Sequence, residues 1–254
     1  MNIYHPSPPY DTRAESMLEA MEHYPASDKD IFLAGYSQLC ASDLSYGHAL
    51  EICGGYGDLA AQMARIFPKC KVSGLDRYVP DSHQAKKALS TYQNLEYIAG
   101  DAFDLSRFED NSLDLIWGQA ALHHLSHDYE GLAKEAARAL KPGGRLIFLF
   151  EPLGHNLFVA AIRAVRMARA ELGDESNLYF SQFERIALYF STTNVQVFNL
   201  IGYPTKVLSD RFQVISNMIH SIDRRLMRFF PSLQRYGANC NLIFQKSLLQ
   251  NPKN

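Results

Sequence analysis

Two periodicities of apolar residues alternate along residues 48–150. The short apolar runs "HALEIC", "CKVSGLD", "LEYIAG", "SLDLIWG" and "GRLIFLF" predict strands. Between them, "DLAAQMARIF", "DSHQAKKALSTY" and "DYEGLAKEAARAL" place their apolar residues at helical spacing. This regular alternation predicts a parallel sheet with helices on both faces, and such sheets bind ligands beyond the carboxyl ends of their strands.

Helical patterns precede this core. Two helices are expected near Ala14–Tyr24 and Asp28–Cys40, the second capped by Asp28 or Ser27. The prediction is therefore an N-terminal helical cap over residues 1–46, within a single domain of residues 1–254.

Further helical patterns follow the core. Residues 153–178 and 203–233 are expected to be helical inserts, separated by the strand "NVQVFNLIG", and "ANCNLIFQKS" closes the chain as a strand. The second insert carries an apolar stripe, flanked by arginines, that must cover something. We predict that the inserts form a substrate lid; a second copy of the chain or a membrane surface are the alternatives for this stripe.

Composition and charge limit the classes of function that are open to the chain. The chain has 254 residues, 47% of them hydrophobic, and a formal net charge of −2, which suits one full-sized core and gives no case for binding nucleic acid. Its four cysteines are scattered and predict neither a disulfide framework nor a metal site. The first residues lack the pattern of a secretory signal, so a cytoplasmic protein is expected.

A glycine cluster carries the main chemical signal. "GYGDLA", from Gly55 to Ala60, fits G-x-G-x-x-A between a strand and a helix, and Asp76 ends the next strand as a ribose-binding acid should. These features alone leave a nicotinamide or flavin cofactor and an adenosyl cofactor open. Glu51 ahead of the glycines would repel a pyrophosphate and attract a cation, and Asp101 is placed to accept a hydrogen bond from an adenine amino group.

Five motifs of the chain together resemble those of a known protein family. "LEICGGYG", "GLD", "GDAFDL", "SLDLIWGQAALHHL" and "LKPGGRLIFLFEP" are similar, in order and spacing, to the motifs of class I S-adenosylmethionine-dependent methyltransferases of the small-molecule group. The resemblance spans about Ala49 to Pro152. It implies a Rossmann-like, doubly wound, seven-stranded sheet that is mostly parallel and has an antiparallel last strand.

The resemblance also implies site residues. Glu51 and the glycines would hold the methionine part of the cofactor, Asp76 the ribose, and Asp101 the adenine. Cys53 stands where the family usually has glycine, which implies a slightly altered pocket. The implied cofactor-binding set is Glu51, Cys53, Gly55, Gly57, Asp76, Arg77, Asp101, Ala102 and Gln119.

Candidates for acid–base chemistry follow two strands. His123 and His124 are candidate bases, and Glu151 and His155 could hold an acceptor or take its proton. Packing or hydrogen bonding is the alternative role for His123 and His124, and capping of the following helix is the alternative for Glu151 and His155. His123 and His127 are four residues apart, but no third ligand is nearby, so no metal is expected.

The predicted function is in-line methyl transfer from S-adenosylmethionine to a carbon, nitrogen or oxygen atom of a small, apolar or aromatic metabolite. A cyclase or rearrangement enzyme, a non-catalytic cofactor-binding subunit, and an NAD-dependent oxidoreductase are the alternatives. The expected partner is a small molecule, with S-adenosylhomocysteine as the product, and the chain is expected to be a monomer or homodimer.

Overall fold

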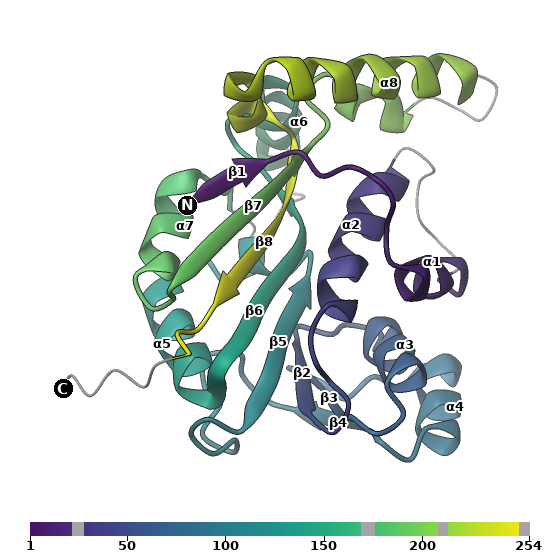
Figure 1. The fold of residues 1–254 in the computed structure, drawn as a ribbon, viewed down its shortest axis with the longest axis vertical. Coiled ribbons are helices and arrows are strands. Elements are labelled where there is room, and N and C mark those ends of the chain that lie inside the picture. Colours follow the sequence, from purple (N-terminus) through teal and green to yellow (C-terminus); the bar gives the residue numbers. More distant parts are fainter. Residues whose placement is uncertain (22–27, 169–175, 208–212, 249–254) are drawn as a thin grey trace.

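The computed structural model of the chain describes residues 1–21, 28–168, 176–207 and 213–248. Within these ranges the strands form one sheet in the order β1-β7-β8-β6-β5-β2-β3-β4 (Figure 1). The strands are β1 (Asn2–Tyr4), β2 (His48–Ile52), β3 (Lys71–Asp76), β4 (Leu95–Ala99), β5 (Leu113–Gln119), β6 (Leu140–Pro152), β7 (Thr192–Phe198) and β8 (Asn239–Gln245).

The sheet confirms the predicted fold class. Strand β8 runs antiparallel to both of its neighbours, β6 and β7, while the other neighbouring strands pair in parallel. The sheet has eight strands among the described residues, one more than predicted. The additional strand, β1, has only three residues and pairs with residues about 190 positions away, such as Asn194 opposite Asn2, so no local alternation announced it.

The helices lie where the helical spacing placed them. The end of the helix predicted over 14–24 lies outside the described residues, and so do the cap candidate Ser27 and parts of the inserts predicted over 153–178 and 203–233. The α-helices are α1 (Thr12–Glu19), α2 (Lys29–Cys40), α3 (Asp58–Ile66), α4 (His83–Thr91), α5 (Tyr129–Ala139), α6 (Leu157–Ala168), α7 (Phe180–Ala187) and α8 (Gln213–Phe229). Three 3-10 helices matter below, η2 (Leu122–His124), η3 (Tyr203–Val207) and η5 (Pro231–Tyr236).

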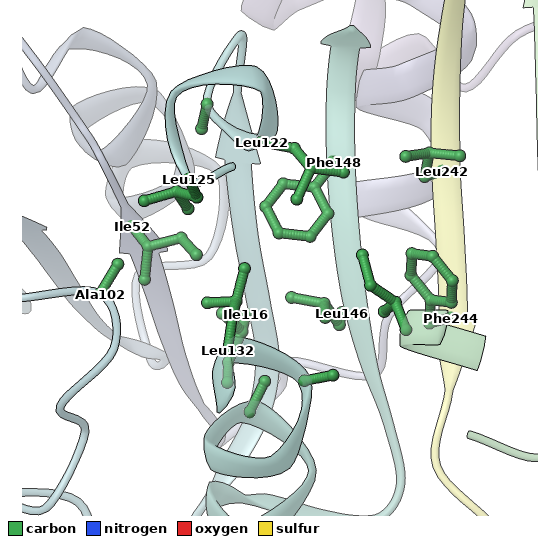
Figure 2. Close-up of a cluster of buried hydrophobic side chains, with 14 of the residues drawn as sticks. Ile52, Ala102, Ile116, Leu122, Leu125, Leu132, Leu146, Phe148, Leu242 and Phe244 are labelled. Carbon is green, nitrogen blue, oxygen red and sulfur yellow. The ribbon is translucent and has the colours of Figure 1, made fainter. Parts of the chain in front are cut away.

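Two hydrophobic clusters cover the two faces of the sheet. On one face, β-strand side chains such as Ile116 and Phe148 pack with Leu132 of α5 and with residues of α7 (Figure 2). On the other face, Trp117 and Leu149 pack with α1, α2 and α3. Since neighbouring residues of β5 and β6 enter opposite clusters, both faces of these strands are buried, as a doubly wound sheet requires.

The predicted N-terminal cap is built into this core. Leu39 and Cys40 of α2 and Met17 of α1 are buried in the second cluster, against the face of the sheet. Residues 2–4 add the edge strand. In contrast, α6 and α8 lie together at one end of the sheet, away from both layers of covering helices (Figure 1).

Candidate active site

Neighbouring strand ends bring the candidate residues to one edge of the sheet. Across this edge, Asp101 follows β4, Asp76 ends β3, Glu51 lies near the end of β2, and Gln119 ends β5. The chain continues outward from β2 to β3 and β4, then returns to place β5 on the other side of β2. This reversal between β2 and β5 is the topological switch point at which doubly wound sheets bind ligands.

The glycine turn after β2 depends on left-handed backbone. Gly55 has φ +53° and Gly57 has φ +79°, values that side chains disfavour. A Cβ atom on Gly57 would lie 2.6 Å from the Tyr97 ring, whereas one on Gly55 would meet no atom within 4 Å. Gly57 is therefore fixed by packing inside the protein, and Gly55 lies beside open space that a ligand can enter.

Tyr97 supports this turn from β4. Its hydroxyl donates a hydrogen bond of 2.8 Å to the carbonyl oxygen of Gly57, and its ring also lies against Gly74 of β3. The sequence motifs did not single out Tyr97. The feature that could have identified it is an aromatic residue in β4 that pairs with Gly74 of the adjacent strand β3. Only glycine at position 74 leaves room for the Tyr97 ring.

Asp76 connects the turn to β3. One oxygen of its carboxylate accepts a hydrogen bond of 2.8 Å from the Gly55 N–H, and the other accepts one of 2.6 Å from the Arg77 N–H. A carboxylate oxygen has room for two hydrogen bonds, so each Asp76 oxygen retains a site for a hydroxyl group. The geometry therefore suits recognition of a vicinal diol.

Glu51 is a buried carboxyl group at the same edge. Its side chain accepts a hydrogen bond of 3.1 Å from the Ala60 N–H at the start of α3. Burial raises the pKa of Glu51 from its ordinary value of 4.5 to about 8, with nearby Asp58 and Asp76 adding to the rise and the Ala60 hydrogen bond opposing it. A cation placed beside it would favour the ionised form.

The remaining predicted cofactor residues surround these groups. The Asp101 carboxylate accepts a hydrogen bond of 2.9 Å from the Phe103 N–H, and the Gly100 N–H donates one of 2.8 Å to the Asp76 carbonyl oxygen. Ala102 is buried, whereas Arg77 is exposed. Asp101 is thus held in a turn beside Asp76 with acceptor capacity to spare.

Cys53 adopts a glycine-like conformation. Its φ is +55°, which explains why glycine is the usual residue at this position of the motif. Burial, together with the neighbouring acids Asp76, Glu151 and Glu51, raises the pKa of its thiol to about 12. The side chain is therefore a neutral thiol at the turn.

The comparisons with known proteins agree with this geometry. Residues 50–148 match the family model described as a methyltransferase domain. The chain is 33% identical over 102 residues to the demethylmenaquinone methyltransferase of Staphylococcus aureus. The aligned segment covers 40% of this chain and 42% of that protein. Residues 50–148 are therefore similar in sequence to methyltransferase domains. The chain thus spans about two fifths of the length of the curated relatives it matches.

Solved structures share the fold of this chain. Haemonchus contortus phosphoethanolamine N-methyltransferase 2, solved with phosphomonomethylethanolamine and S-adenosylhomocysteine, superposes with a TM-score of 0.56 at 19% identity. The match covers 85% of this chain and 52% of that one. A SAM-dependent methyltransferase from Archaeoglobus fulgidus has a TM-score of 0.56 at 15% identity, covering 84% of this chain and 92% of that one.

A wall of aromatic residues lies beside the Gln119 end of the domain. The Tyr36 hydroxyl of α2 donates a hydrogen bond of 3.0 Å to the Gln119 Oε1 atom and also contacts Met21. Phe32 of α2 stacks on Phe150 of β6, with ring centroids 4.8 Å apart. Helix α2 therefore brings aromatic side chains to the side of the edge opposite Asp76 and Asp101.

Glu151 and His123 form a buried pair next to this wall. One Glu151 oxygen accepts hydrogen bonds from the N–H groups of Ala121 and Leu122, at 2.7 and 2.8 Å. The other accepts one from the His123 N–H at 3.3 Å and lies 2.8 Å from the His123 Nδ1 atom. Glu151 is fully buried, so the carboxylate holds the start of η2 and orients the His123 ring.

The other histidine candidates lie in different surroundings. The His124 ring is exposed and lies 4.2 Å from that of His123, centroid to centroid. The ring of His155, on the segment before α6, stacks on Phe180 at 5.1 Å, and its Nε2 atom accepts a hydrogen bond of 3.4 Å from the Phe180 N–H. Burial lowers the pKa of His155. The structure thus brings His123, His124 and Glu151 together. It places His155 apart from them, packed against Phe180 of α7.

In the part of the chain that the structure describes, no three histidine, cysteine, aspartate or glutamate side chains gather as metal ligands. Among the same residues, no helix has both the length and the apolar character needed to cross a bilayer.

Proposed function

We propose that this chain is an S-adenosylmethionine-dependent methyltransferase acting on a small, apolar or aromatic metabolite. The observation that carries the proposal is the geometry of the Asp76 carboxylate. Its two oxygens accept hydrogen bonds from the N–H groups of Gly55 and Arg77, and each oxygen can still accept one more. When bound, the sulfonium cofactor would supply an electrophilic methyl group. The chain would bind, orient and desolvate the two reactants.

The residues present fit this cofactor. The space beside Gly55 admits the ligand, and Asp76 would accept the two ribose hydroxyls. Asp101, held beside Asp76, would accept a hydrogen bond from the adenine amino group. Glu51 would attract the cationic methionine end, and that interaction would offset the cost of ionising a buried carboxyl group.

The same carboxylates argue against a dinucleotide. A pyrophosphate bound at the start of α3 would lie near the carboxylate of Asp58, a like charge, and would raise the pKa of Glu51 further, so that Glu51 would stay neutral and offer no attraction. A buried acid at this position favours a cation. An adenosyl sulfonium therefore fits the edge better than NAD does, although both share the ribose-binding acid.

The acceptor side favours an apolar or aromatic molecule. Tyr36 and Phe32 are buried near the Gln119 end, and Phe150, which stacks on Phe32, is half-buried, so its ring offers an aromatic surface of the kind that suits flat apolar groups. The name of the Staphylococcus aureus relative indicates a demethylmenaquinone acceptor, which is also apolar and aromatic. The Haemonchus contortus structure instead contains a phosphorylated amine. We therefore infer an acceptor of the first kind, such as a phenol or hydroquinone.

His123 is the proposed base for an acceptor hydroxyl. An ionised Glu151 accepts hydrogen bonds, so it holds the proton on Nδ1 and leaves Nε2 with a lone pair. Loss of a proton from the acceptor would make its oxygen a stronger nucleophile. Glu151 acts here as a positioning residue, because its own oxygens bind protein groups.

A transfer assay tests the function. Purified protein is incubated with S-adenosylmethionine carrying a labelled methyl group, together with a hydroquinone, a phenol or phosphoethanolamine. The expected result is label in the hydroquinone or phenol, and little label with phosphoethanolamine or with the Asp76→Ala variant. Labelling of phosphoethanolamine alone would contradict the inferred acceptor class. Cofactor binding without transfer to any acceptor in a broad metabolite extract would favour a non-catalytic subunit or a rearrangement enzyme.

A further inference from the structure

Helix α8 presents its apolar residues to the surroundings of the protein. Val214 and Phe229 are both 72% exposed and Met218 is 61% exposed, and Ile215 and Ile222 lie on the same stripe. In most surface helices such a stripe faces the core. On α8 the stripe faces outward instead.

Polar contacts fix that orientation. Asp223, on the inner face of α8, is buried and accepts hydrogen bonds of 2.9 and 3.1 Å from the N–H groups of Ile201 and Gly202. His220, also buried, lies 2.9 Å from the Thr205 hydroxyl of η3. Rotating the helix to bury its apolar stripe would leave these polar groups unsatisfied, at a cost of about 1–3 kcal/mol each.

Helix α6 has the same reversed arrangement. Arg163 is buried and donates a hydrogen bond of 2.9 Å to the Ser176 carbonyl oxygen. Leu157, on the opposite side, is 83% exposed, and Phe158 and Val165 are exposed with it. Figure 1 shows α6 and α8 at the same end of the molecule, and both helices expose apolar residues.

Basic residues accompany these apolar faces. Arg225 and Arg228 of α8 are exposed, and Arg224 pairs with Asp30 of α2 at 2.9 Å. Across the described parts of both helices the sole acidic side chain is Asp223, which is buried. The exposed charge on α6 and α8 is therefore positive, although the chain as a whole has a formal net charge of −2.

We propose that the outer faces of α6 and α8 dock on a lipid bilayer that contains anionic lipids. We call this surface the α6–α8 face and define it by Leu157, Phe158, Ile162, Val165, Val214, Ile215, Met218, Ile222, Arg225, Arg228 and Phe229. Its apolar side chains enter the boundary between headgroups and acyl chains, and the arginines bind the anionic headgroups. A large exposed apolar patch of this kind marks an interaction surface.

The charge of the α6–α8 face favours lipid over a second copy of the chain. In a two-fold dimer the same patch meets itself, so Arg225 and Arg228 of both copies would lie close together. Like charges in an interface are unfavourable, whereas an anionic bilayer neutralises them. The docking does not depend on methyl transfer, so it can be tested separately from the proposed function.

Vesicle sedimentation tests the proposal. The full chain is mixed at low salt with vesicles of phosphatidylcholine alone, or of phosphatidylcholine with phosphatidylglycerol. Binding is expected to the anionic vesicles and to fall with added salt. The Arg225→Gln/Arg228→Gln variant should bind the anionic vesicles roughly thirtyfold less tightly. The Arg107→Gln/Lys134→Gln variant, which removes two exposed charges elsewhere, should bind as the parent does.

A matched apolar pair completes the test. Met218→Glu should abolish sedimentation with anionic vesicles, and Leu188→Glu, at an 80% exposed position outside the α6–α8 face, should not. Failure of the parent chain to bind anionic vesicles would overturn the proposal, and so would equal losses in the control variants. A dimer in lipid-free solution that Met218→Glu dissociates would also overturn it, by assigning the face to a second copy.

Discussion

The His123 Nδ1 atom lies 2.8 Å from a Glu151 carboxylate oxygen, and both side chains are buried. His123 lies on η2, which follows β5, and Glu151 lies near the end of β6, so the pair joins the neighbouring strands at their carboxyl ends. The same carboxylate accepts three backbone N–H groups. One acid therefore shapes the loop after β5 and orients the ring of its histidine.

Replacing Glu151 should destabilise the protein. The Glu151→Gln side chain would turn an N–H₂ group toward backbone N–H donors, so at least one buried donor would lose its acceptor. We expect a loss of about 2–4 kcal/mol in the free energy of unfolding, measured by urea denaturation. Glu184→Gln, at an exposed position on α7, is the control and should change stability by less than about 0.5 kcal/mol. Equal stability of the two variants would contradict the role given to Glu151.

The two adjacent histidines should differ in their effect on turnover. His123→Ala is expected to lower the rate of methyl transfer to a hydroxyl acceptor by about 10²–10⁴-fold without changing cofactor affinity, because a general base is lost. His124→Ala should change the rate only a few-fold. Single-turnover rates and cofactor dissociation constants of both variants provide the measurement. Similar rates in both variants would exclude His123 as the base.

Stability should depend on pH through Glu51. Its pKa is about 8 in the folded chain and near 4.5 when exposed, so the folded state holds this proton more tightly. The contribution to stability is present below about pH 4.5 and is lost as the pH rises toward 8. Urea denaturation between pH 5 and 9 should show this fall, and Glu51→Gln, which stays neutral, should reduce it. An unchanged pH profile in the variant would show that other groups cause the dependence.

The two glycines of the turn should respond differently to alanine. Gly57→Ala places a Cβ atom 2.6 Å from the Tyr97 ring and should cost about 2–4 kcal/mol of stability. In Gly55→Ala the added Cβ atom meets no neighbour, so the cost is that of a left-handed backbone at alanine, about 1–2 kcal/mol of stability. It should nevertheless weaken cofactor binding strongly, because its methyl group enters the ligand space. Thermal unfolding and cofactor titration separate the two effects, and unaltered binding by Gly55→Ala would contradict the proposed path of the cofactor.

Local patterns were sufficient to predict the central fold. Strands β2 to β6 and their helices carry strong periodicity and short links, so their order and the edge that gathers Glu51, Asp76 and Asp101 follow from the sequence. The antiparallel β8 was expected from the family resemblance and is confirmed. The positive φ of Cys53 explains why the motif usually has glycine there.

Other features depend on contacts between distant residues. Strand β1 is too short to carry a pattern, and the hydrogen bond from Tyr36 to Gln119 joins residues 83 positions apart. The spacing on α8 predicted an amphipathic helix correctly, but hydrogen bonds of Asp223 and His220 decide which side faces inward. The roles of the catalytic candidates, the division into cap and lid, the oligomeric state and the cellular location stay predictions.

The most direct measurement is a calorimetric titration with S-adenosylhomocysteine, with NAD as the comparison ligand. We predict that the parent chain binds S-adenosylhomocysteine and not NAD. Asp76→Ala should lose about 1.5–3 kcal/mol of binding free energy for each hydrogen bond to the charged group. Asp81→Ala, which removes an exposed acid paired with Lys86, should bind as the parent does. Binding of NAD without binding of S-adenosylhomocysteine would contradict the account and assign the edge to a dinucleotide.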